Sequence, residues 1–170
     1  MTVQWIFVSA LAVYAAATLR MTHHMKDVGG TETMPDLKFG FTPELLRELR
    51  EHTWGEKGCE AYVKAASVDL FPYMESYTVI LWSLATVACR DCSNPRKNLA
   101  RLMAMIPICF DVVETFILRQ TCLRDISDEW VQVGSVANQL KWLSFGSFLS
   151  IFLPLWFWTR RGSNNNIKAE

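Results

Sequence analysis

Residues 69–89, DLFPYMESYTVILWSLATVAC, carry two acidic side chains near one end and are otherwise uncharged. A helix of about 20 mostly apolar residues is long enough to cross a bilayer hydrocarbon core of about 30 Å. Pro72 removes one backbone donor and predicts a kink near the start of this segment. Three other segments have the same character, at residues 3–19, 102–118 and 136–158. The sequence therefore predicts an all-α integral membrane protein, a single domain over residues 1–170 built as a four-helix bundle.

The composition of the 170-residue chain agrees with this class. Hydrophobic residues make up 51% of it and charged residues only 20%, and 17 basic and 17 acidic residues give a net charge of zero. A nucleic-acid-binding protein carries a surplus of basic residues, and a disordered chain has few hydrophobic ones. Both classes are excluded, and we expect no nucleic-acid partner.

The distribution of charge predicts an orientation. Four spans place the N-terminus, residues 90–101 and the polar tail 159–170 on one side, where the net charge is +5. The opposite side, which carries the long loop 20–68 and the loop 119–135, has a net charge of −2. Because a basic excess in short loops faces the cytoplasm or the mitochondrial matrix, we expect both termini on that side.

The long first loop is predicted to contain an interfacial amphipathic helix in residues 41–58, FTPELLRELREHTWGEKG. Thr42 can cap its start, Pro43 suits its first position, and Gly55 or Gly58 can end it. Three leucines recur at helical spacing and should face the membrane or the other helices. They are Leu45, Leu46 and Leu49.

Polar residues inside the predicted spans raise the free energy of insertion into a membrane. An ionisable group near the bilayer centre costs about 2.5–3.5 kcal/mol on insertion scales, so it should face the bundle interior and find a partner. Asp111 and Glu114 are three residues apart, as are Asn138 and Lys141, so each pair shares one helix face. Counting along each span places Glu114 and Lys141 at the same depth, which predicts an ion pair between them. We expect one intramembrane polar cluster, formed by Asp69, Glu75, Asp111, Glu114, Asn138 and Lys141. It is either a buried network that fixes the register of the helices or a functional site.

The five cysteines divide by predicted side. Cys89 and Cys92 form a CxxC pair, a pattern found in redox and metal sites; without a second ligand pair it does not predict zinc, and we expect no metal or cofactor. Cys59 and Cys122 fall on the opposite side. They could form a disulfide if that side is an oxidising compartment.

Two segments resemble the superfamily of the emopamil-binding protein and the sigma-2 receptor, which have four spans, a long first loop and acids inside the bundle. They are VDLFPYMESY at residues 68–77 and IPICFDVVETF at residues 106–116. The resemblance implies the handling of sterols or lipophilic amines. It makes Glu75, Asp111 or Glu114 the candidate acids and Trp142 a candidate aromatic wall.

Two functions are compatible with the sequence. The first is a non-catalytic accessory subunit of an energy-transducing, respiratory-type complex of the mitochondrial inner membrane, in contact with other membrane subunits and lipids. The second is a sterol- or lipid-binding or isomerising protein, with the endoplasmic reticulum as the alternative location. A dry cavity of about 300–1,000 Å³ beside the acids would favour the second function. A closed cluster saturated by Lys141 and Asn138 would favour the first.

Overall fold

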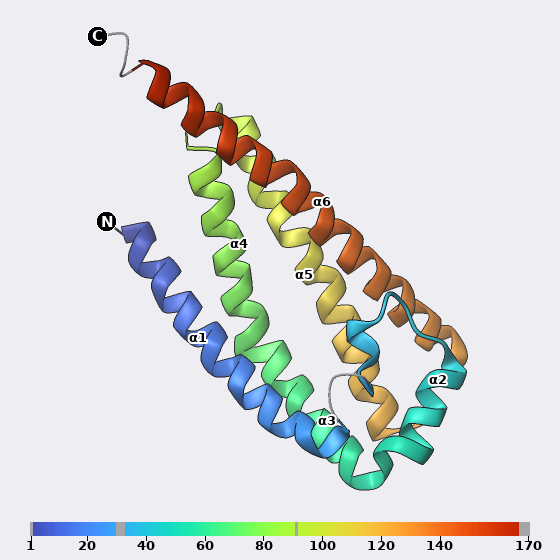
Figure 1. Ribbon diagram of the computed structural model, residues 1–170. Coiled ribbons are helices and arrows are strands. Elements are labelled where there is room, and N and C mark those ends of the chain that lie inside the picture. Colours follow the sequence, from blue (N-terminus) through green and yellow to red (C-terminus); the bar gives the residue numbers. More distant parts are fainter. Residues whose placement is uncertain (1, 30–32, 91, 167–170) are drawn as a thin grey trace.

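The computed structural model describes residues 2–29, 33–90 and 92–166 and places almost all of them in helices (Figure 1). This part of the chain contains no β-strand, which confirms the predicted all-α class. The helices are α1 (Thr2–Met25), α2 (Pro43–Glu48), α3 (Gly55–Val68), α4 (Met74–Ala88), α5 (Asn94–Leu123) and α6 (Asp128–Asn166). Short 3-10 turns occupy Lys26–Val28 and Pro35–Leu37, and π-helical segments occupy Leu49–Trp54 and Asp69–Tyr73.

The long helices lie along one another, and α2 covers one end of the bundle (Figure 1). The start of α1 and the far part of α6 lie toward the opposite end. The α5 and α6 helices pack against each other along much of their length, whereas α1 packs against α3 and α4. Each of the four predicted spans falls largely within one of the long helices.

The loop helix begins as predicted, and its helical course ends at Gly55, one of the two predicted ends. Thr42 Oγ1 accepts a hydrogen bond from the Leu45 amide at 3.3 Å, and Pro43 is the first helical residue. Regular α-helix stops at Glu48, a π-helical segment follows, and the chain turns at Gly55, whose φ of 56° favours glycine. Leu46 and Leu49 are buried and Leu45 packs against the same core, as their spacing predicts.

The predicted kink at Pro72 separates α3 from α4. Phe71 has extended dihedral angles (φ −140°, ψ 131°), because the ring of a following proline disfavours the helical conformation. The helix predicted over residues 69–89 therefore becomes regular only at Met74. This break lets Asp69 and Tyr73 lie beside α1 and α5 rather than continue a straight helix.

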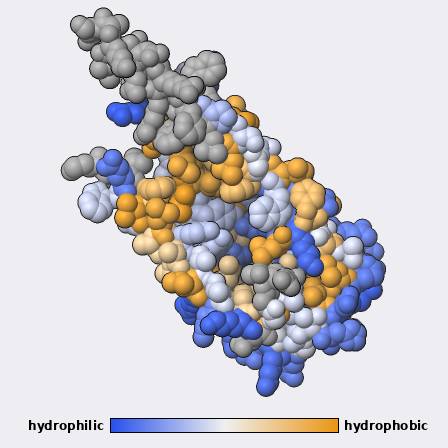
Figure 2. All heavy atoms as spheres, viewed as in Figure 1, coloured by the Kyte–Doolittle hydropathy of each residue, from blue (hydrophilic) through white to orange (hydrophobic). Residues whose placement is uncertain are grey.

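One helix of the described residues, over Gln4–Met25, is long and apolar enough to span a membrane by length and composition. Much of its surface is exposed, including Trp5 and Leu19. Figure 2 shows hydrophobic side chains over the middle of the bundle and hydrophilic ones at the end that carries α2. The finer expectation, four spans across a bilayer, remains a prediction.

Two hydrophobic cores stabilise the bundle. The first lies at the end that carries α2 and includes Trp54, Tyr62 and Leu118. The second joins α4, α5 and α6 around Ala85, Ala104 and Phe148. Along α5 and α6, the polar residues expected to form a cluster lie between these two cores.

Candidate functional site

Lys141 on α6 is the centre of the buried polar network. Its Nζ lies 2.5 Å from Glu114 Oε2 and 3.1 Å from Asp111 Oδ1. The two acids face α6 together because they are one helical turn apart on α5. The predicted ion pair between Glu114 and Lys141 is confirmed, and Asp111 shares the same cation.

Asn138 completes the coordination of Glu114. Its Nδ2 donates to Glu114 Oε1 at 2.5 Å, and the Lys141 ion pair meets Oε2, which has no hydrogen bond among the described residues of this fully buried site. The amide oxygen of Asn138 accepts from the Gly40 backbone N–H at 2.8 Å. Asn138 lies one turn before Lys141, so a single face of α6 supplies both partners.

The first loop is attached to the same face of α6. The backbone carbonyl of Asp36 accepts hydrogen bonds from Asn138 Nδ2 at 3.0 Å, Trp142 Nε1 at 3.3 Å and Lys141 Nζ at 3.5 Å. The Phe41 amide donates to Ser135 Oγ at 3.0 Å. These bonds satisfy backbone groups of an irregular segment that would otherwise be left unpaired.

Hydroxyl groups extend the network toward α4 and α1. Tyr77 donates to Asp111 Oδ2 at 2.7 Å, and Thr115 donates to Asp69 Oδ2 at 2.9 Å. Tyr73 shares a hydrogen bond with Tyr14 of α1 at 2.9 Å. Asp69, which precedes α4, and Asp111 on α5 thus lie on one polar surface with these tyrosines.

This polar surface forms one wall of a cavity of about 640 Å³. Asp36, Asp69, Asp111 and Lys141 line it on the polar side. The remaining lining is mostly apolar and includes Leu11, Met21, Ile80, Leu81 and Phe145. Trp142, the predicted aromatic wall, lines the cavity as well. A cavity of this size and lining is typical of sites for lipophilic small molecules.

The carboxyl group of Asp36 is the unsatisfied member of this wall. Its Oδ1 is buried and has no hydrogen-bond partner among the described residues. Burial raises the pKa of this carboxyl above its ordinary value, and the charge of Lys141 opposes the shift. An unpaired buried acceptor of this kind is suited to a donor group on a bound molecule.

Ion pairs and hydrogen bonds join four of the six residues expected in the polar cluster, Asp111, Glu114, Asn138 and Lys141, and Asp69 lines the same cavity, where it accepts from Thr115. Glu75 is not among them, because its side chain is exposed on α4. Cys89 and Cys92 lie where α4 connects to α5, and the Cys92 amide donates to the Cys89 carbonyl at 3.1 Å. In the described parts of the chain, no group of three or more His, Cys, Asp or Glu side chains is arranged to hold a metal ion.

Three residues of the site were not found from the sequence: Asp36, Tyr73 and Tyr77. The two tyrosines are four residues apart after the predicted kink, a spacing that places side chains on one helix face and could have indicated them as a pair. Asp36 lies in a segment without periodicity, where no comparable signal exists.

No protein-family model, no curated protein and no solved structure matches this chain. The resemblance to the four-span superfamily remains a prediction. The function is therefore argued from the geometry of the cavity and its polar wall.

Proposed function

We propose that this protein is a four-span membrane protein that binds a lipophilic small molecule of sterol or lipid size in the 640 Å³ cavity. The observation that carries the proposal is a mostly apolar lining combined, in one cavity, with a cluster of ionisable side chains. Apolar side chains such as Leu11, Ile80 and Phe145 would contact the body of the ligand. The polar wall would orient its head group.

The charged groups of the polar wall determine which kind of ligand head group the cavity would accept. Lys141 is already engaged by Asp111 and Glu114. Asp36 and Asp69 add further acceptor oxygens to the cavity, and Asp36 Oδ1 has no partner among the described residues. A ligand that donates a hydrogen bond, such as the hydroxyl of a sterol, complements this wall. The lining holds three carboxyl groups, Asp36, Asp69 and Asp111, against two lysines, Lys26 and Lys141, so an anionic head group would meet a small excess of acids.

Binding is favoured over acid–base catalysis. A general acid or base needs a group free to exchange a proton with the substrate. Glu114 is fully buried with one oxygen hydrogen-bonded and the other in an ion pair, Asp111 is held by Lys141 and Tyr77, and Glu75 is exposed. The three acids implied by the family resemblance are thus poorly placed for isomerisation, although Asp111 lines the cavity.

The binding test uses the full chain in detergent and two fluorescent probes. Dehydroergosterol carries a hydroxyl group, and cis-parinaric acid carries a carboxylate. We expect dehydroergosterol to bind at least tenfold more tightly, measured by energy transfer from tryptophan. Equal affinity for both probes, or no binding of the sterol, would contradict the proposal.

A matched pair of variants locates the binding site. Ile80→Trp fills the cavity, whereas Leu84→Trp places the same bulk on an exposed position of the same helix. We expect Ile80→Trp to weaken sterol binding at least tenfold and Leu84→Trp to leave it unchanged. Similar affinities for the two variants would place the sterol outside the cavity.

The accessory-subunit function predicted from the sequence remains a second candidate. The observation that favours it is the exposed apolar surface of α1, which includes Trp5, Val8 and Leu19 and would contact lipids or partner helices. In that case the protein should migrate on a native gel, after mild solubilisation, with a complex much larger than its own 19.5 kDa. Migration as a monomer would contradict this function.

A further inference from the structure

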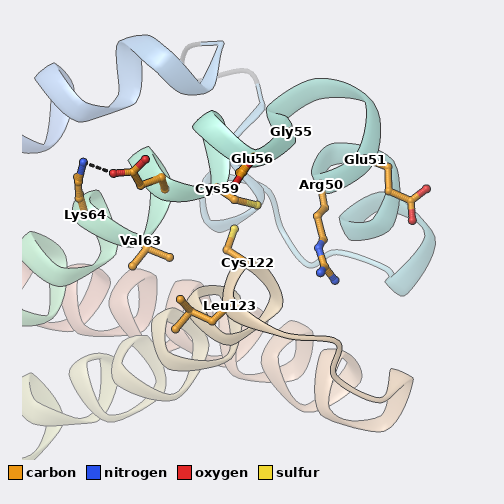
Figure 3. Close-up of a pocket in the computed structure, with 10 residues that line it drawn as sticks. Arg50, Glu51, Gly55, Glu56, Cys59, Val63, Lys64, Cys122 and Leu123 are labelled. Carbon is orange, nitrogen blue, oxygen red and sulfur yellow. Dashed lines mark hydrogen bonds and ion pairs between the residues drawn. The ribbon is translucent and has the colours of Figure 1, made fainter.

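Two cysteines that are far apart in the sequence face each other at the end of the bundle that carries α2. Cys59 lies on α3 and Cys122 lies in the last turn of α5. Figure 3 shows their sulfur atoms pointing toward each other. Both side chains line the same surface hollow, and both are free cysteines in this structure.

The surroundings of the pair allow a reagent to reach it. Both side chains line a surface hollow of about 530 Å³ whose rim includes Arg50 and Glu56 (Figure 3). Cys122 is partly exposed, whereas Cys59 is buried. Burial raises the pKa of the Cys122 thiol, contact with Cys59 raises it further, and the charge of Arg50 lowers it. The net shift of this pKa is upward, so thiol–disulfide exchange at the pair should be faster at alkaline pH, where more of the thiolate is present.

We propose that Cys59 and Cys122 are a redox pair that forms a disulfide between α3 and α5. The proposal is independent of ligand binding in the other cavity. The oxidant is a low-molecular-weight disulfide such as oxidised glutathione. The Cys122 thiolate attacks one of its sulfurs, forms a mixed disulfide and releases one thiol. Cys59, as its thiolate, then attacks the Cys122 sulfur, closes the protein disulfide and releases the second thiol.

The reaction balances without another reactant. Two protein thiols are oxidised by the loss of two electrons, and one oxidant disulfide is reduced to two thiols that take up the two protons. The predicted orientation places both cysteines on the non-cytoplasmic side, where disulfides persist. Cys89 and Cys92 are predicted on the opposite side, where thiols stay reduced.

The disulfide would close a long loop of the chain. A cross-link of this kind reduces the conformational entropy of the unfolded state. Because the thiols already face each other from two packed helices, the native structure should accept the bond with little movement. We therefore expect the oxidised protein to melt about 5–15 °C higher than the reduced protein.

The test uses the purified full chain in detergent, treated with oxidised glutathione or with dithiothreitol. Remaining thiols are blocked with N-ethylmaleimide before digestion with trypsin, which yields Cys59 in residues 58–64 and Cys122 in residues 120–124. We expect these two peptides to be linked in most oxidised chains and separate after reduction. Recovery of both peptides carrying only maleimide or glutathione would overturn the proposal.

A matched control separates this pair from the other cysteines. Cys109 is an exposed cysteine on the same helix as Cys122. Cys109→Ser should keep the linked peptides and the rise in melting temperature, whereas Cys122→Ser should lose both. If oxidised wild-type protein carries the link but melts at the same temperature as the reduced protein, the inference that the bond stabilises the contact of α3 with α5 would be overturned.

Discussion

Lys141 Nζ lies 2.5 Å from Glu114 Oε2 at a point where the Glu114 side chain is completely buried. A buried ion pair adds little net stability compared with apolar residues, but the loss of one partner leaves an uncompensated charge. Asp111 shares the cation, so Lys141 balances two carboxylates. This relationship makes Lys141 the residue on which the structure of the polar wall depends most strongly.

Lys141→Met should therefore destabilise the protein strongly. We expect a loss of about 3–5 kcal/mol because Glu114 and Asp111 would lose their counter-charge. Thermal melting in detergent measures the effect. The matched control is Lys64→Met, which removes an exposed ion pair with Glu60 and should leave the melting temperature nearly unchanged. Equal melting temperatures for wild type and Lys141→Met would contradict the buried pairing.

Asn138→Ala should detach the first loop from α6. It removes hydrogen bonds to Glu114 Oε1, to the Gly40 amide and to the Asp36 carbonyl, at a cost of about 1–3 kcal/mol. Hydrogen exchange should become faster at residues 36–41 than in the wild type. Gln132→Ala, at an exposed position of the same helix, is the control and should not change this exchange.

Gly134 sets the distance between α5 and α6. A Cβ atom at Gly134 would lie 2.9 Å from Ile117 Cγ2 and 3.3 Å from Phe41 Cζ, whereas a Cβ at Gly146 meets nothing within 4 Å. Gly134→Ala should lower the free energy of unfolding by about 1–3 kcal/mol through overpacking. Gly146→Ala should raise it by about 0.5–1 kcal/mol, because alanine favours the helix. If both substitutions shifted the melting temperature in the same direction, that result would argue against close packing at Gly134.

Asp36→Asn should have a pH-dependent effect on stability. Burial raises the folded-state pKa of Asp36 above its unfolded value of 3.8 despite Lys141, and Asp111 also raises it. The folded state therefore holds the proton more tightly, and the stability contribution of Asp36 falls as the pH rises from the unfolded pKa through the folded one. The neutral amide lacks this penalty.

Melting curves between pH 4 and pH 8 test this prediction. The variant should match the wild type near pH 4 and become more stable than it as the pH rises. The substitution also removes the effect of the Asp36 charge on the groups around it, which include Tyr62, Asp69 and Glu114, so the difference reports on Asp36 together with these electrostatic partners. A difference in melting temperature between variant and wild type that stays constant with pH, or that grows toward acidic pH, would contradict the raised pKa of Asp36.

The sequence identified the pairing of Glu114 with Lys141 because helical spacing and depth along a span are both properties of a single segment. The same reasoning placed Asn138 beside Lys141, which the structure confirms. It failed for Glu75, which is exposed while Met74 and Ser76 beside it are buried. The kink at Pro72 resets the rotation of the helix, so depth alone did not indicate which face Glu75 occupies.

The sequence by itself determined the helical class, the cap at Thr42, the kink before α4 and the faces of α5 and α6 that carry polar residues. Each of these follows from local backbone chemistry or from a repeat of three to four residues. Only the tertiary structure brought the Asp36 carbonyl to α6, Tyr77 to Asp111 and Cys59 to Cys122. The hydrogen bonds among these contacts join residues 34 to 106 positions apart along the chain, and the cysteine contact joins α3 to α5. No local pattern fixes how such distant segments approach each other. The cavity beside the polar wall exists for the same reason, because its shape depends on how four packed helices and one loop meet.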